Sequence, residues 1–277
     1  GRHFVAVTDP GSPLVTEAEE FGFLRTFESP ADVGGRYSAL TAFGLLPMAL
    51  MGADIARIVE WARQLEYECS PGLPESANPA VRLGASLALS AKGGRDKLTL
   101  TASESVGSFP LWIEQLVAES TGKSGYGIVP VTGEPLPPVE GCPQDRVFVH
   151  YSVAGDDDSG ARMALDQLSA AGHPVFLIDL PEPEALGGEF LRWEIATATA
   201  GAVLGVNPFD EPDVSAAKQA TANLLEQRAS DGAFPTATAR ASDGGIDLFP
   251  AENGSPAEDA SVGGLLSEWL AQGEEGG

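Results

Sequence analysis

The stretch 32-DVGGRYSALTAFGLLP-47 begins as a turn and continues as an apolar run. We expect the adjacent glycines Gly34 and Gly35 to take positive φ and to let a ligand approach the backbone closely. Arg36 follows them directly, and the apolar residues from Leu40 to Leu46 recur with the spacing of a buried helix. A guanidinium held at the N-terminal end of such a helix favours an anionic ligand. The alternative is an ordinary glycine turn with a surface arginine.

The composition of the whole chain excludes several classes of protein and partner. The 277 residues carry a formal net charge of −24, which argues against nucleic acid as a partner and requires any anion site to be locally basic. No apolar run is long enough for a transmembrane helix, so no membrane partner is expected. Cys69 and Cys142 form no CxxC pair and no disulfide framework, which favours a cytoplasmic setting.

Apolar periodicity predicts an α/β fold with a mainly parallel sheet. The uninterrupted apolar strand at 174–180 is typical of a sheet that is covered on both faces. In the long helical region 47–68, we expect Met51 and Trp61 to be core residues. The predicted helices are 14–21, 80–92, 109–120, 161–171, 186–204, 215–228 and 265–270, and the predicted strands are 4–7, 23–27, 97–101, 127–131, 146–151 and 174–180.

Residues 231–258 are polar and rich in glycine and proline, so we expect a loop-dominated extension there. The chain opens on a predicted strand without Met and ends in a run of Gly and Glu. We therefore expect a piece of a longer protein, cut at both ends.

Two further stretches carry candidate reactive groups. Glu119 stands in the last turn of an apolar helix, an end that the helix dipole makes unfavourable for a carboxylate, and this marks it as a candidate base. The alternative is a surface glutamate paired with Lys123 at i+4. Lys218 follows the phrase 207-NPFDEPDV-214 on a predicted helix, and its alternative is a helix-surface lysine.

Together the three stretches carry a family resemblance. The run GGRYS followed by TAFGL, the segment 115-QLVAESTGK-123 and the segment 207-NPFDEPDVSAAK-218 resemble three ordered motifs of phosphoglucose isomerases. The chain most resembles the isomerase half of fused transaldolase/glucose-6-phosphate isomerases, from Phe4 to about Arg228. The third motif departs from the family at Glu211, Asp213 and Ser215, while Phe209, Asp210, Val214 and Lys218 keep their spacing.

The resemblance implies a sugar-isomerase (SIS-like) three-layer α/β/α fold. It implies the tail of a first SIS-like subdomain at 1–52, a second subdomain with its preceding helix at 53–229, and a loop-rich extension at 230–277. It also implies a transaldolase domain upstream in the same chain, and it leaves the oligomeric state open.

The activity implied by the resemblance is the glycolytic and gluconeogenic isomerisation of glucose 6-phosphate and fructose 6-phosphate through a cis-enediol(ate). Glu119 would move the proton between C2 and C1, Arg36 would stabilise the developing charge, and Lys218 would assist ring opening. No cofactor and no metal would be needed, and the partner would be a sugar phosphate substrate. The implied substrate-binding residues are Gly35, Arg36, Ser38 and Lys123.

One part of the family pattern is missing. Single-function members carry a ring-opening His after the Glu segment, whereas here the residues 133-GEPLPP-138 fill that region, as in the fused members. The chain's own histidines, His3, His150 and His173, do not match the motif. We therefore also consider a non-catalytic, regulatory sugar-phosphate-binding domain. A third reading, a spacer, predicts Arg36, Glu119 and Lys218 more than about 20 Å apart, beyond the reach of one substrate. The family's phosphate-gripping loop is absent, so we expect no useful turnover from these residues alone.

Overall fold

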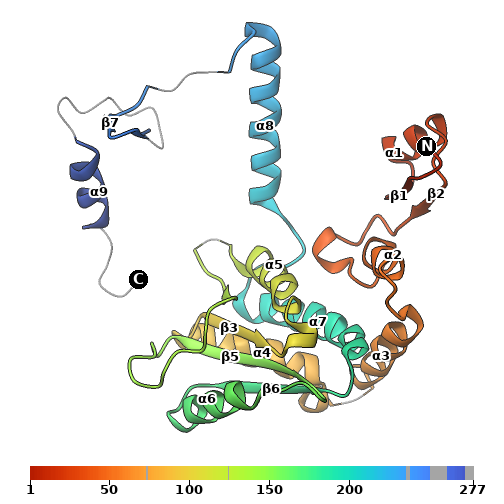
Figure 1. Cartoon of the computed structure of the whole chain (residues 1–277), viewed down its shortest axis with the longest axis vertical. Helices are drawn as coiled ribbons and strands as arrows, with labels where there is room; N and C mark the ends of the chain where they lie inside the picture. The colour runs from red at the N-terminus through yellow and green to blue at the C-terminus, as the bar shows by residue number, and fades with distance from the viewer. Residues whose placement is uncertain (73, 124, 235–237, 250–260, 272–277) are drawn as a thin grey trace. The chain divides into compact units, whose positions relative to one another are not determined.

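The computed structural model describes residues 1–72, 74–123, 125–234, 238–249 and 261–271. The chain divides into two compact units, residues 1–211 and residues 212–277, and each is described by itself. The first unit carries all the elements up to α7 in Figure 1, and the second unit begins with α8.

Most elements of the first unit follow the predicted pattern of helices and strands. The first unit contains β1 (Val5–Thr8), α1 (Pro13–Glu20), β2 (Arg25–Glu28), α2 (Ala42–Leu50), α3 (Ile55–Glu68), α4 (Pro79–Lys92), β3 (Lys97–Ala102), α5 (Phe109–Thr121), β4 (Val129–Val131), β5 (Arg146–Val153), α6 (Ser159–Ala170), β6 (Val175–Leu180) and α7 (Leu186–Leu204). The second unit contains α8 (Pro212–Asp231), β7 (Ala241–Asp243), β8 (Ile246–Leu248) and α9 (Val262–Leu270).

The main sheet is parallel throughout, in the order β4-β3-β5-β6, and this confirms the predicted α/β class. Its central strand β5 alternates between the two faces, because successive side chains of a strand point in opposite directions. The odd-numbered residues from Val147 to Val153 enter the larger core with α4, α5 and α7, while Phe148 packs on Leu165 and Leu168 of α6. Helices therefore cover both faces of the sheet in three layers, as Figure 1 shows.

Local sequence explains where the helices of the core begin and how closely they cross. Asn78 caps α4, since its Oδ1 accepts hydrogen bonds from the amides of Ala80 and Val81 at 3.1 and 3.0 Å. α7 packs tightly on α3 because Gly187 has no side chain: a Cβ there would lie 1.9 Å from the carbonyl oxygen of Ile58. These crossings place α7 across the face of the sheet that carries the main core.

Several sequence-based expectations are wrong. The region 47–68 is two helices, because the chain breaks at Gly52, which has a φ of 93°. α2 has no buried residue, and Met51 is 88% exposed rather than part of the core. Periodicity reports that a segment is apolar but does not supply the partner that would bury it. Trp61, in contrast, packs against the core as predicted.

The glycine turn and the edge of the sheet also differ from expectation. Gly34 has φ −64° and ψ 153°, and neither it nor Gly35 takes positive φ, because the chain passes directly into a 3-10 turn over Gly35–Tyr37. Leu177 of β6 is 40% exposed, since β6 ends the described sheet instead of lying inside it.

The second unit is small and open. α8 has no buried residue, and β7 and β8 form a short antiparallel hairpin within the region that we predicted to be loop-dominated. Residues 250–258 of that prediction lie outside the described residues. Within the described ranges, no helix has both the length and the apolar character to cross a bilayer.

Candidate functional site

Arg36 is the centre of a buried polar cluster, and its side chain is only 5% exposed. Its Nε lies 3.4 Å from Oε1 of Glu119, and its Nη1 donates to Ser120 Oγ at 2.8 Å. Nη1 also donates to the carbonyl of Pro208 at 3.1 Å, and Nη2 donates to the carbonyl of Asp210 at 3.0 Å. Three of the five N–H groups of the guanidinium therefore donate hydrogen bonds to protein acceptors, and Nε forms an ion pair with Glu119.

The first two sequence motifs and the opening part of the third, residues 207–210, therefore meet within the first unit. The 3-10 turn with Arg36, the end of α5 with Glu119, and the loop 207–210 after α7 all contribute to one cluster. α5 and α7 each follow a parallel strand and return antiparallel to it, so both helices end at the edge where the strands begin. The surface-arginine alternative is wrong, and Glu119 pairs with Arg36 rather than with Lys123.

Tyr37 joins the same cluster from the other side of the turn. Its hydroxyl lies 3.4 Å from Ser120 Oγ and 3.3 Å from the carbonyl of Pro208, and its ring centroid is 5.1 Å from that of Phe209. Burial raises the pKa of the Tyr37 phenol, and the nearby carboxyl of Glu194 adds to that rise. Ser120 was not predicted as a site residue, although it directly follows the predicted base.

Lys123 binds the loop 207–210 that follows α7. Its ammonium donates to the carbonyls of Asn207 and Asp210, and it pairs with the carboxylate of Asp210. The Lys123 side chain is 9% exposed, and its three N–H groups have three protein acceptors. A direct contact with substrate would therefore cost the ammonium one of these bonds.

The predicted binding residues Gly35 and Ser38 shape the turn itself. Ser38 Oγ donates to the carbonyl of Gly35 at 2.7 Å. A Cβ built on Gly35 would meet nothing within 4 Å, so this side of the turn is open. Lys218 lies on α8 of the second unit, so its approach to Arg36 stays a prediction.

Two of the histidines are integrated into the fold. His150 is 2% exposed, and its ring nitrogens lie 2.8 Å from Thr101 Oγ1 and 3.2 Å from Asp158 Oδ2. His173 is also buried and packs edge-on against Phe148. Both side chains are core components of the sheet and its α6 layer.

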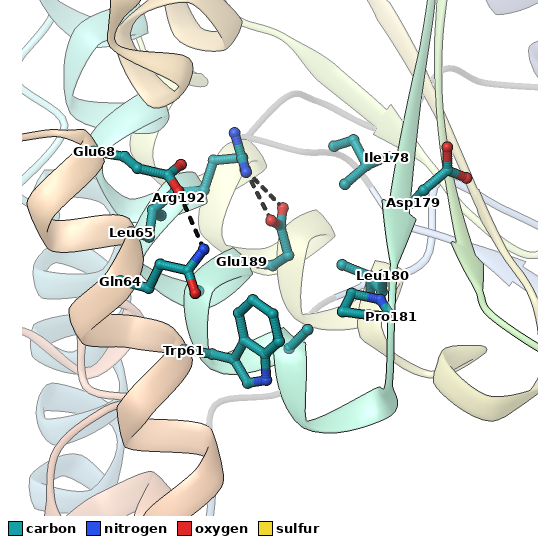
Figure 2. A pocket seen from close by; sticks show the side chains of 12 residues that line it. Trp61, Gln64, Leu65, Glu68, Ile178, Asp179, Leu180, Pro181, Glu189 and Arg192 are labelled. Carbon is teal, nitrogen blue, oxygen red and sulfur yellow. Dashed lines mark hydrogen bonds and ion pairs between the residues drawn. The ribbon is translucent and has the colours of Figure 1, made fainter.

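A separate pocket of about 110 Å³ lies between α3, the end of β6 and α7, and it shares no residue with the Arg36 cluster. Figure 2 shows Arg192 reaching the carboxylate of Glu189, with Nε 2.9 Å from both oxygens. Behind this pair, the hydroxyl of Tyr151 donates to Glu189 at 2.9 Å and accepts from Trp193 Nε1 at 2.5 Å. Burial raises the pKa of Glu189.

This second network was missed from the sequence, although Glu189 and Arg192 have the i,i+3 spacing of a helical ion pair. Each polar group in it has a partner within the fold, which is how a buried charge pair is stabilised. We therefore place the candidate function at the Arg36 cluster, where residues of the three motifs meet.

Comparison with known proteins shows which proteins the whole chain resembles. The chain is 31% identical over 255 residues to the glucose-6-phosphate isomerase of Leptospira biflexa, covering 76% of this chain and 55% of that protein. It is also 31% identical over 263 residues to the glucose-6-phosphate isomerase of Heliobacterium modesticaldum, covering 81% of this chain and 58% of that protein. The sequence resemblance to the phosphoglucose isomerase family is thereby confirmed. No family model matches the chain.

Solved structures confirm the fold. A glucose-6-phosphate isomerase from Chlamydia trachomatis superposes with a TM-score of 0.62 at 17% identity, covering 82% of this chain and 53% of that chain. A glucosamine-6-phosphate deaminase from Thermotoga maritima superposes with a TM-score of 0.52 at 12% identity, covering 76% and 64% respectively. The chain spans little more than half the length of the curated relatives it matches.

Proposed function

We propose that this chain, a relative of the glucose-6-phosphate isomerases, forms part of an enzyme that interconverts glucose 6-phosphate and fructose 6-phosphate. The observation that carries the proposal is the contact between Glu119 and Arg36 at 3.4 Å, made by two motifs that lie far apart in sequence. A carboxylate and a guanidinium in contact are the two groups that a proton shuttle with an enediolate intermediate requires.

In the proposed reaction Glu119 removes the proton from C2 and returns it to C1. Its side chain is 27% exposed, so a substrate can reach it. Nη2 of Arg36 donates one hydrogen bond, to the Asp210 carbonyl, and its second N–H is available to stabilise the enediolate oxygen. Because the other N–H groups are anchored, the guanidinium needs little reorganisation when charge develops.

The remaining predicted residues take supporting roles. Gly35 offers an open backbone for close approach of the sugar phosphate, and Ser38 holds the turn that presents it. Lys123 acts on the substrate mainly through the loop 207–210 that it fastens. Lys218 would assist ring opening, as the family resemblance implies.

The test is the substitution Glu119→Gln in the natural polypeptide that contains these 277 residues. The amide oxygen of Gln can still accept from Arg36, so the fold should be retained while isomerase activity falls by about a thousandfold or more. Glu66→Gln, on the exposed face of α3, is the matched control and should leave the rate unchanged. Activity of Glu119→Gln within about tenfold of wild type would remove Glu119 from this role.

A regulatory sugar-phosphate-binding domain makes a different prediction. Titration calorimetry with fructose 6-phosphate would then show binding while the ligand remains chemically unchanged. The absent ring-opening His, a trait shared with the fused family members, also supports a transaldolase unit in the same polypeptide, and the two unpaired cysteines support a cytoplasmic enzyme. The upstream coding sequence and cell fractionation test these two points.

A further inference from the structure

One face of α7 carries two buried polar atoms that have no hydrogen-bond partner among the residues that the structure describes. They are Oε1 of Glu194 and Oγ1 of Thr197, three residues apart and therefore neighbours on one side of the helix. Thr197 is 2% exposed. By contrast, Thr199 on the same helix donates to the carbonyl of Ile195 at 2.8 Å, the usual local solution for a helical threonine.

This face of α7 leads to the Arg36 cluster. Gly201 lies seven residues beyond Glu194, on the same face, and a Cβ there would meet the ring of Pro208 at 2.8 Å. Pro208 supplies the carbonyl that lies near both Arg36 and the Tyr37 hydroxyl. The nearby carboxyl of Glu194 contributes to the raised pKa of the Tyr37 phenol. Thr197 lies between Glu194 and Gly201 on the same face of α7.

The carboxyl of Glu194 has no basic partner within the described chain. Burial raises its pKa to about 8, so the neutral acid, which carries an O–H donor, prevails at neutral pH. Several ionisable groups on the elements that surround α7 are either coupled to Glu194 or paired elsewhere. These are Tyr37, the Arg36–Glu119 pair, Lys92 of α4 at the carbonyl of Val203, and the Arg57–Glu182 pair between α3 and the segment after β6.

We propose that Glu194 and Thr197 hold one water molecule against the phenol of Tyr37, and that Glu194 is thereby a positioning residue of the Arg36 cluster. A buried water needs two to four polar partners, and the carboxyl, the threonine hydroxyl and the phenol supply three. Such a water fixes Tyr37 on Ser120, which in turn accepts from Arg36 at 2.8 Å. The inference rests on the proposed isomerase function only for its effect on rate.

The inference predicts an effect of pH on the rate. When Glu194 ionises at alkaline pH, it loses its O–H donor and places a negative charge beside Tyr37. The hydrogen bonds through the water then rearrange, and the rate should decline. Gln carries neutral donor and acceptor groups at every pH, so Glu194→Gln should keep the contact without the decline.

The experiment measures kcat and KM from about pH 6 to 9.5 in the natural polypeptide, a range that spans the titration. Glu194→Gln should stay within about threefold of wild type at pH 7 and lose the alkaline decline. Glu194→Ala and Thr197→Val should lower kcat by about tenfold and leave KM within about twofold. Thr199→Val and Glu66→Gln are the controls and should match wild type.

An alkaline decline that is identical in wild type and Glu194→Gln overturns the inference, as does full activity of Glu194→Ala. If Glu194→Ala fails to fold, the pH profile of Glu194→Gln still decides.

Infrared spectroscopy gives a readout that does not depend on activity. Wild type at neutral pH should show the C=O stretch of a protonated carboxyl group, and this band should vanish in Glu194→Gln but persist in Glu66→Gln. A wild-type protein without isomerase activity would count against the proposed function alone. A wild-type spectrum without that band would count against the role of Glu194.

Discussion

Replacing Arg36 with Met should cost about 3 kcal/mol of the free energy of unfolding, because Arg36 joins three segments of the first unit. Met has a similar length but no donor, so the bonds to Glu119, Ser120, Pro208 and Asp210 are lost together. Each lost bond should cost about 1 kcal/mol, which is the value for an ordinary hydrogen bond and below the range for charge-assisted bonds. The low value applies because two of the acceptors keep another donor when Arg36 is replaced. The Pro208 carbonyl still has the Tyr37 hydroxyl, and the Asp210 carbonyl still has the Lys123 ammonium.

The four losses sum to about 4 kcal/mol, and relief from burying a charged guanidinium returns about 1 kcal/mol. Arg36→Lys should fall between Met and wild type, since one ammonium cannot reach acceptors that a planar guanidinium spans. A cost of about 3 kcal/mol is a large share of the stability of a typical domain and should lower Tm by several degrees. Activity lost in an Arg36 variant therefore reports on catalysis only where that variant is shown to be folded.

Urea denaturation followed by circular dichroism measures the effect. Arg63→Met, at an exposed position of α3, is the matched control and should stay within about 0.5 kcal/mol of wild type. If Arg36→Met unfolds at the same urea concentration as this control, Arg36 does not hold the three segments together. If Arg36→Lys is as stable as wild type, the cluster does not require the planar guanidinium and its several N–H donors.

Three more substitutions test other parts of the structure. Gly35→Ala should change stability by less than about 0.5 kcal/mol but lower isomerase activity by about tenfold, because the added methyl group occupies only the open side where substrate approaches. Gly187→Ala should destabilise the protein by about 2 kcal/mol, because its Cβ would collide with the carbonyl of Ile58. Asp158→Asn should lower the free energy of unfolding at neutral pH. As the pH becomes acidic, that free energy should then fall less than it does in wild type. The Ser152 hydroxyl lowers the pKa of Asp158 from 3.8 to about 2, so this stabilisation is present above 3.8 and lost as the pH falls through 2.

Gly160→Ala on α6 is the common control for the two glycine substitutions, because a Cβ there meets nothing within 4 Å. Full isomerase activity of Gly35→Ala would show that substrate does not approach that turn. Thermal unfolding of Gly187→Ala at the wild-type temperature would show that α3 and α7 do not depend on the close crossing. If the free energy of unfolding falls as much in acid for Asp158→Asn as for wild type, other carboxylates cause that fall.

The core of the first unit follows from local sequence. β6 begins with an apolar run, and the helices between the strands have apolar residues at helical spacing and clear terminal signals, such as Pro110 in the first turn of α5. Each of these signals acts within a few residues, so a single sequence is enough to read them. The alternation of these elements then implies a parallel sheet covered by helices.

Burial was harder to predict than element type. α2 has the composition of a core helix, yet none of its residues is buried, and Met51 is exposed. A local pattern states which surface of a segment is apolar, whereas burial depends on what packs against that surface. The same limit applied to Gly34 and Gly35, where two glycines allow positive φ but the turn that follows does not require it.

By itself, the sequence determined the class of fold, the ends of the main helices and the three motifs that point to a sugar isomerase. Only the tertiary structure decided what those motifs do to one another. Arg36 meets Ser120 across 84 residues and Asp210 across 174, and it pairs with Glu119, for which Lys123 was the alternative partner. Contacts of that separation arise when parallel strands return their helices to one edge of the sheet, and no local spacing of residues records where that edge will form.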